Sequence, residues 1–151
     1  MNDNIIIEKI WEEDGLFDCF FELRVTSENK FIRASSEIYT DRSGIMELCE
    51  GIRKFTDGEI NEFHWQSGEF GDDSSECFSL KMANEDELGH VLIEVRGEIG
   101  DGGGYSAHNY CFYVRTEIGV LGEMGKRLRK FGDIGNIGIR TGIYEENDEF
   151  R

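Results

Sequence analysis

The sequence predicts an α+β domain, built from a mostly antiparallel sheet of about six to eight strands and two amphipathic helices. Apolar and polar residues alternate in several segments, and this period of two is typical of half-buried strands. Two other segments, at about 41–56 and 116–131, carry apolar residues at spacings of three and four, which indicates amphipathic helices. Short turn-like segments join neighbouring strands, so we expect hairpins and helices that cover one face of the sheet or its ends.

The first three strands are expected at about 4–11, 16–26 and 31–39. In the second of them Phe17, Cys19, Phe21, Leu23 and Val25 would share one face, and Phe20 interrupts the polar face. The segment 27–30 has the composition of a hairpin turn.

The first helix is expected to begin at a cap provided by Thr40 or Asp41 and to end near Asp57-Gly58. Its spacing of apolar residues predicts one buried stripe along the helix. The stripe consists of Ile45, Met46, Leu48, Cys49, Ile52 and Phe55.

Four further strands are expected at about 61–66, 77–83, 91–98 and 105–115. In the third, Val91, Ile93 and Val95 fall on one face. The glycine-rich segment 100–104 lacks the Lys-Ser/Thr of a phosphate-binding loop and is followed by a strand, so we interpret it as a turn.

The second helix would begin at Thr116, and its last turn is basic, which suits the negative end of a helix. Gly119, Gly122 and Gly125 are spaced by three, although each glycine costs roughly 1 kcal/mol relative to alanine inside a helix. We therefore expect this glycine face to let the helix approach the sheet closely.

The 151 residues are expected to form one domain, 1–151, in which 132–151 is a Gly/Ile-rich segment with a frayed acidic tail. No apolar run approaches the roughly 20 residues of a membrane helix, so we expect no membrane partner. The four cysteines are scattered without a CxxC pair, which is typical of reduced thiols and predicts a cytoplasmic location.

The net charge is −16, and it is unevenly distributed, with −7 in residues 1–50, −8 in 51–100 and −1 in 101–151. Such a field repels nucleic acid and anionic membranes and accelerates encounter with a basic protein. The alternative is that the charge only keeps the protein soluble. No arrangement of residues predicts a catalytic, cofactor or metal site. Cys111 and His108 are three apart on one strand and so point to opposite faces, and the acids at 69–76 do not have EF-hand spacing.

Several positions together resemble the WapI-type immunity proteins of bacterial polymorphic toxin systems, over about residues 17–131. The resemblance rests on Phe21-x-Leu23-x-Val25 with Phe31-x-x-Ala34, on the helix from Met46 to Phe55, on 89–95, and on Phe112-x-Val114-x-Thr116-Glu117 with a helix ending Leu128-x-x-Phe131. It implies a non-enzymatic cytoplasmic protein that neutralises a toxin domain, often a basic nuclease, and it offers no catalytic motif.

For that function we expect exposed acids in loops to pair with the lysines and arginines of the partner, and an aromatic residue to anchor the contact. The predicted partner-binding residues are Glu69, Asp72, Asp73, Glu76, Glu85, Asp86, Glu87 and the aromatic anchor Trp65.

Two other hypotheses remain open at this point. One is a small-molecule-binding or enzymatic domain with a pocket lined by Tyr105, His108 and Tyr110 beside the glycine-rich loop. The other is an oligomeric structural protein, such as a homodimer, that uses an exposed sheet edge.

Overall fold

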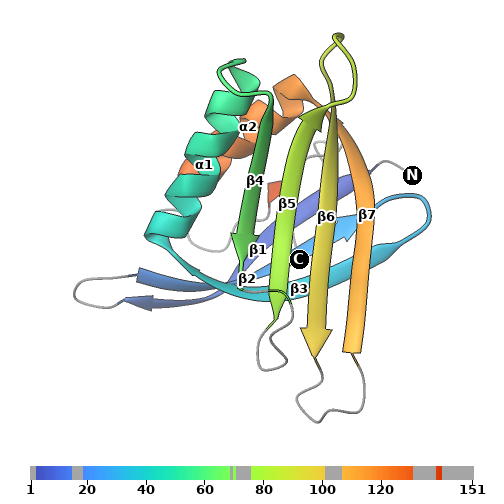
Figure 1. Cartoon of the computed structure of the whole chain (residues 1–151). Helices are drawn as coiled ribbons and strands as arrows, with labels where there is room; N and C mark the ends of the chain where they lie inside the picture. The colour runs from blue at the N-terminus through green and yellow to red at the C-terminus, as the bar shows by residue number, and fades with distance from the viewer. Residues whose placement is uncertain are drawn as a thin grey trace, which may run out of the picture.

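The computed structural model describes residues 3–14, 19–68, 70, 76–100, 107–130 and 139–140. Its described part contains two helices and two antiparallel sheets, which confirms the predicted α+β class (Figure 1). Sheet A has the strand order β3-β2-β1-β8 and sheet B the order β4-β5-β6-β7. Sheet A comprises β1 (Asn4–Asp14), β2 (Cys19–Glu28), β3 (Arg33–Asp41) and the two-residue β8 (Ile139–Arg140). Sheet B comprises β4 (Glu62–Ser67), β5 (Cys77–Asn84), β6 (His90–Gly100) and β7 (Ala107–Glu117).

The strands are divided between two sheets, and those of sheet A run crosswise to those of sheet B (Figure 1). The chain passes from sheet A to sheet B through α1 (Arg42–Thr56), which connects β3 to β4. Within each sheet, strands adjacent in sequence pair as expected from hairpin connections. Local patterning predicts such neighbours, but it does not show where one sheet ends and the next begins.

The first helix begins as predicted, because Asp41 is its N-cap and the Asp41 carboxylate accepts a 2.7 Å hydrogen bond from the Gly44 amide. The prediction for the second helix is wrong in detail. Thr116 lies in β7, and α2 (Ile118–Arg129) follows an N-cap at Glu117 whose side chain makes no capping bond. The two helices lie beside each other, and α1 also contacts β4 (Figure 1).

One hydrophobic core joins both sheets and both helices. The predicted inward faces are confirmed for Val91, Ile93 and Val95, which are fully buried. Met46 was predicted to belong to the buried stripe of the first helix, but it is exposed and the prediction is wrong there. The other five residues of that stripe are buried, as the helical spacing predicts: Ile45, Leu48, Cys49, Ile52 and Phe55.

Side chains hold the two sheets together at the edge formed by β3. The Ser67 hydroxyl donates to the Tyr39 carbonyl oxygen at 3.2 Å, and the Glu76 carboxylate accepts from the Glu37 amide at 2.9 Å. The Tyr110 hydroxyl also meets the Ser36 hydroxyl across the sheets.

The edge formed by β7 is covered in a similar way. Asn29 Nδ2 donates to the Tyr113 carbonyl oxygen at 3.1 Å, and Asp3 accepts from the Arg115 amide at 2.8 Å. Both side chains come from the part of the chain that forms sheet A or its turns. Backbone groups at each of these two edges are therefore satisfied within the chain, which leaves less of the edge for a strand of a second copy.

Close packing at glycine occurs in α1 and at one position of α2. A Cβ added at Gly51 would lie 2.0 Å from the Phe63 ring, and one at Gly125 would lie 2.9 Å from Ile52 Cγ2. At Gly119 and Gly122 an added Cβ would meet nothing within 4 Å. The predicted close approach of the glycine face to the sheet is therefore wrong, because only Gly125 is crowded and its neighbour belongs to the other helix.

Neither described helix combines the length and apolar character needed to cross a membrane.

Candidate functional site

The structure places the predicted partner-binding acids in separate regions. Glu69, Asp72 and Asp73 lie outside the described residues. Glu76 immediately precedes β5, whereas Glu85 and the two acids after it follow the end of that strand. Eight strand residues separate these positions, and at about 3.3 Å per residue they lie on the order of 25 Å apart. The described acids therefore do not form one surface.

Glu76 has a structural role, because it accepts the Glu37 amide and closes the edge of β3. Burial raises the pKa of the Glu76 carboxyl, and the nearby carboxylates of Glu37 and Glu22 raise it further, while the hydrogen bond from the Glu37 amide opposes them. Because the Glu76 carboxylate is partly buried and already accepts the Glu37 amide, it is less accessible to a cation of a partner than an exposed acid is.

The acids after β5 build the β5–β6 turn. Asp86 accepts from the Leu88 amide at 2.8 Å and contacts His90 Nδ1 at 2.6 Å, and Glu85 pairs with Arg115 at 3.2 Å. The hydrogen bond between Asp86 and His90 lowers the pKa of the Asp86 carboxyl and raises the pKa of the His90 imidazole. Glu87 is exposed and is the acid of this group that remains best placed for a partner.

Trp65 is a core residue, and its burial does not favour the prediction that it anchors a partner. Its side chain is only 4% exposed, and its indole Nε1 donates to the Gly44 carbonyl oxygen of α1 at 3.1 Å. Side chains alternate along β4, so Trp65 points inward while the residues on either side of it are exposed.

The hypothesis of a pocket near the glycine-rich loop is not favoured at the residues that can be placed. Tyr105 lies outside the described residues, and His108 is exposed. The Tyr110 ring lies over Gly97, where an added Cβ would be 2.3 Å from the ring, and the Tyr110 hydroxyl bonds to Ser36. Tyr110 thus links the two sheets. In the part of the chain that the structure describes, no three His, Cys, Asp or Glu side chains gather in a way that could hold a metal ion.

A surface that the sequence did not reveal lies on the outer side of sheet A. Three aromatic side chains are exposed there, with 48% of Trp11, 46% of Phe20 and 69% of Tyr39 accessible. The register places Trp11 opposite Glu22 and Glu22 opposite Tyr39, so the three residues form one row across β1, β2 and β3. Residues directly opposite one another in an antiparallel sheet share a face.

Carboxylates surround these aromatic rings. Glu13 lies opposite Phe20 in the next row, and Glu8 and Glu37 flank Arg24 in the row on the other side. Arg24 pairs with Glu37 at 3.1 Å and is the one cation among the eight residues named next. We name this surface the acid–aromatic face, and it consists of Glu8, Trp11, Glu13, Phe20, Glu22, Arg24, Glu37 and Tyr39.

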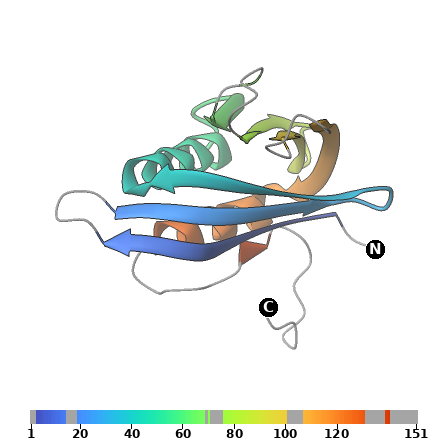
Figure 2. The ribbon, with the colours of Figure 1, turned by 90° about the horizontal axis from the view of Figure 1, so that it is seen from below.

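The acid–aromatic face points away from the rest of the fold. Seen from below, β1, β2 and β3 lie in front, with both helices and sheet B behind them (Figure 2). The carboxylates of the face act on Tyr39, because the negative charge of Glu22 is the chief cause that raises the pKa of the Tyr39 hydroxyl. A register shift between Lys9 and Trp11 turns the indole outward, where regular alternation along β1 would turn it inward.

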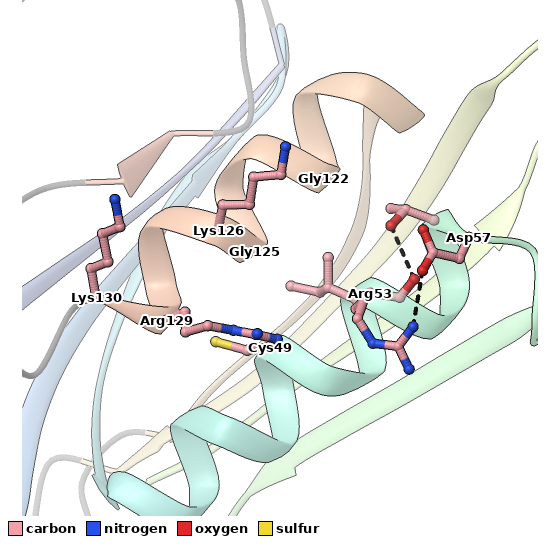
Figure 3. A pocket seen from close by; sticks show the side chains of 10 residues that line it. Cys49, Arg53, Asp57, Gly122, Gly125, Lys126, Arg129 and Lys130 are labelled. Atoms are coloured by element: carbon pink, nitrogen blue, oxygen red, sulfur yellow. Dashed lines mark hydrogen bonds and ion pairs between the residues drawn. The ribbon is translucent and has the colours of Figure 1, made fainter.

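The second candidate site is a cleft of about 410 Å³ between α1 and α2, which we name the interhelical cleft (Figure 3). Its walls are mostly apolar and include Cys49, Ile52, Gly122 and Gly125. Four basic residues also line it: Arg53, Lys126, Arg129 and Lys130. Burial raises the pKa of the Cys49 thiol to about 11, so at neutral pH the thiol is protonated and belongs to the apolar wall.

Comparisons with protein-family models, with curated proteins and with solved structures find no match to this chain. The resemblance to WapI-type immunity proteins accordingly stays a prediction.

Proposed function

We propose that this protein is a non-enzymatic binding protein that neutralises a basic protein partner, such as a nuclease-like toxin domain, in the bacterial cytoplasm. The observation that supports the proposal most strongly is the acid–aromatic face. It combines exposed rings and carboxylates on a sheet surface that no described element of the fold covers.

The chemistry of this face suits arginine and lysine side chains. A guanidinium stacks on the face of a tryptophan or tyrosine ring, and a carboxylate beside the ring accepts its hydrogen bonds. Trp11 and Tyr39 flank Glu22 in this way, so one cation placed over the row would meet a ring and a carboxylate together. Tyrosine, tryptophan and arginine are also the residues that dominate protein–protein hot spots.

The charge of the whole chain supports the same partner. A net charge of −16 accelerates the encounter with a basic protein and repels nucleic acid. In a nuclease that grips phosphates with lysines and arginines, the carboxylates of this face would take the place of the phosphates. The resemblance to immunity proteins points in the same direction, and it is on this ground that we name a toxin domain as the partner.

The experiment that tests the proposal is co-purification of the full chain with the product of the neighbouring upstream gene, at low and at high salt. We expect a complex that weakens as salt rises, because exposed charge pairs are screened. A Glu22→Lys variant should lose the complex, whereas Glu47→Lys, which reverses an exposed acid of α1 outside the acid–aromatic face, should retain most of it. Failure of the wild-type chain to bind the neighbouring product at either salt concentration would contradict the proposal.

A further inference from the structure

We propose that the interhelical cleft binds an amphipathic anion, a molecule with an apolar body and a carboxylate or phosphate head. This inference concerns a different surface from the acid–aromatic face and does not depend on the proposed function. It rests on the volume and lining of the cleft, on one glycine, and on the cations at its margin.

The cleft has the dimensions and chemistry of a small-molecule site. Its volume of about 410 Å³ lies within the roughly 300–1,000 Å³ typical of ligand pockets, which are mostly apolar with a few polar groups. Ile52 of α1 lies next to Gly125 of α2, and the protonated Cys49 thiol of α1 and Gly122 of α2 also line the cleft (Figure 3). An apolar body would therefore be buried between the helices.

Gly122 keeps this space open. A Cβ at Gly122 would meet no atom within 4 Å, so packing does not require glycine there, although glycine costs roughly 1 kcal/mol relative to alanine inside a helix. Gly125 differs, because Ile52 Cγ2 would lie 2.9 Å from its Cβ. A side chain at position 122 would project into the cleft, whereas Gly125 is explained by helix packing alone.

The cations at the margin are not equally available. Arg53 is engaged by Glu50 at 2.7 Å, by Asp57 at 2.9 Å and by Glu59 at 3.2 Å. It turns toward Asp57 and so stabilises the end of α1 (Figure 3). Arg53 therefore has little capacity left for a ligand.

The last turn of α2 supplies the remaining positive charge. Arg129 approaches Glu50 only at 3.7 Å, and Lys130 forms no ion pair with the residues that the structure describes. Lys126 pairs with Glu123 at 3.2 Å, and both side chains are largely exposed to solvent. An anionic head would thus lie near Arg129 and Lys130, with the apolar body directed along the cleft toward Gly122.

The test uses the full chain and three probes with the same apolar tail: dodecanoate, dodecyl phosphate and dodecyltrimethylammonium, each below its micelle concentration. Two-dimensional NMR follows the amide signals of Gly122 and Gly125. We expect saturable shifts with at least one anionic probe and at least about tenfold weaker binding of the cationic probe, and a comparison of the two anions shows which head is preferred.

Variants locate the binding. Gly122→Leu fills the cleft and should weaken binding at least about tenfold, whereas Gly119→Leu, on an exposed part of the same helix where an added Cβ also meets nothing, should bind as wild type does. The double variant Arg129→Glu/Lys130→Glu should abolish the preference for anions. Binding that survives Gly122→Leu, equal binding of all three probes, or no saturable shift with either anion would overturn the proposal.

Discussion

The packing of the Phe63 ring on Gly51 makes the sharpest prediction about stability. Gly51 is buried in α1, and an added Cβ would lie 2.0, 2.1 and 2.5 Å from three atoms of the Phe63 ring, which comes from β4. Carbon atoms do not approach so closely, so Gly51→Ala must displace the ring or move the helix away from the sheet.

The magnitude follows from two opposing effects. Overpacking of a core costs typically 1–3 kcal/mol, and complete loss of the packing of a phenylalanine costs about 3–5 kcal/mol. Alanine returns about 1 kcal/mol through its higher helix propensity. We therefore expect Gly51→Ala to lower the free energy of unfolding by about 1–3 kcal/mol. Gly122→Ala is the matched control, because its Cβ enters open space and should raise the free energy of unfolding by about 0.5–1 kcal/mol.

Urea denaturation followed by circular dichroism measures both variants against the wild type, with the midpoint and the slope compared together. A chain of this size should lose roughly 2–12 °C of melting temperature for Gly51→Ala. If Gly51→Ala stabilised the protein as much as Gly122→Ala did, the Phe63 ring could not lie on α1, and the reasoning would be refuted.

Three further predictions concern pH and the buried tryptophan. The pKa of Glu76 is raised above its ordinary 4.5, so the folded state favours the protonated form and wild-type stability should fall as pH rises from about 4.5 through the folded pKa; Glu76→Gln, which still accepts from the Glu37 amide, should flatten this slope in denaturation curves measured between pH 4 and 7. The Asp86–His90 contact should be strongest between the ordinary pKa values of 3.8 and 6.5, because the His90 contribution is lost as pH rises through its raised pKa and the Asp86 contribution is lost as pH falls through its lowered pKa. Amide protection in the β5–β6 turn, measured relative to the intrinsic exchange rate at each pH, should be greatest in that window, and His90→Ala should remove the loss of protection at its upper end. Trp65→Phe should cost about 1–3 kcal/mol of stability through the lost hydrogen bond and packing, and leave partner affinity unchanged, which calorimetry of the complex would check.

Local sequence rules predicted much of the fold because each element carries its own signal. Asp41 caps α1 since its carboxylate reaches the Gly44 amide, and the alternation of Val91, Ile93 and Val95 places them in the core. The division into two sheets was not predictable in this way. It depends on contacts between distant segments, such as Ser67 with Tyr39, and these leave no periodic trace.

The structure does not gather the described part of the predicted partner-binding residues into one surface, for physical reasons that can be named. Acids in predicted loops are obvious candidates for partner binding, but Asp86 and Glu76 make structural hydrogen bonds. Asp86 accepts the Leu88 amide in the β5–β6 turn, and Glu76 accepts the Glu37 amide at the edge of β3. The outward side of Trp11 was not predictable from alternation, because a single register shift in β1 reverses the side on which the indole lies. A residue-by-residue reading cannot show that Trp11, Glu22 and Tyr39 come from three strands and form one row.

The measurement that most directly tests the central claim is the affinity of the wild-type chain and of Tyr39→Ala for the purified neighbouring gene product, by calorimetry at two salt concentrations. The Tyr39 side chain is exposed, so its removal should leave folding intact, which the melting curve verifies. The proposed contact predicts about thirtyfold weaker binding for Tyr39→Ala, the magnitude of a hot-spot residue, and weaker binding of both proteins at the higher salt. Equal affinity of the two proteins for the partner would contradict the acid–aromatic face as the binding surface.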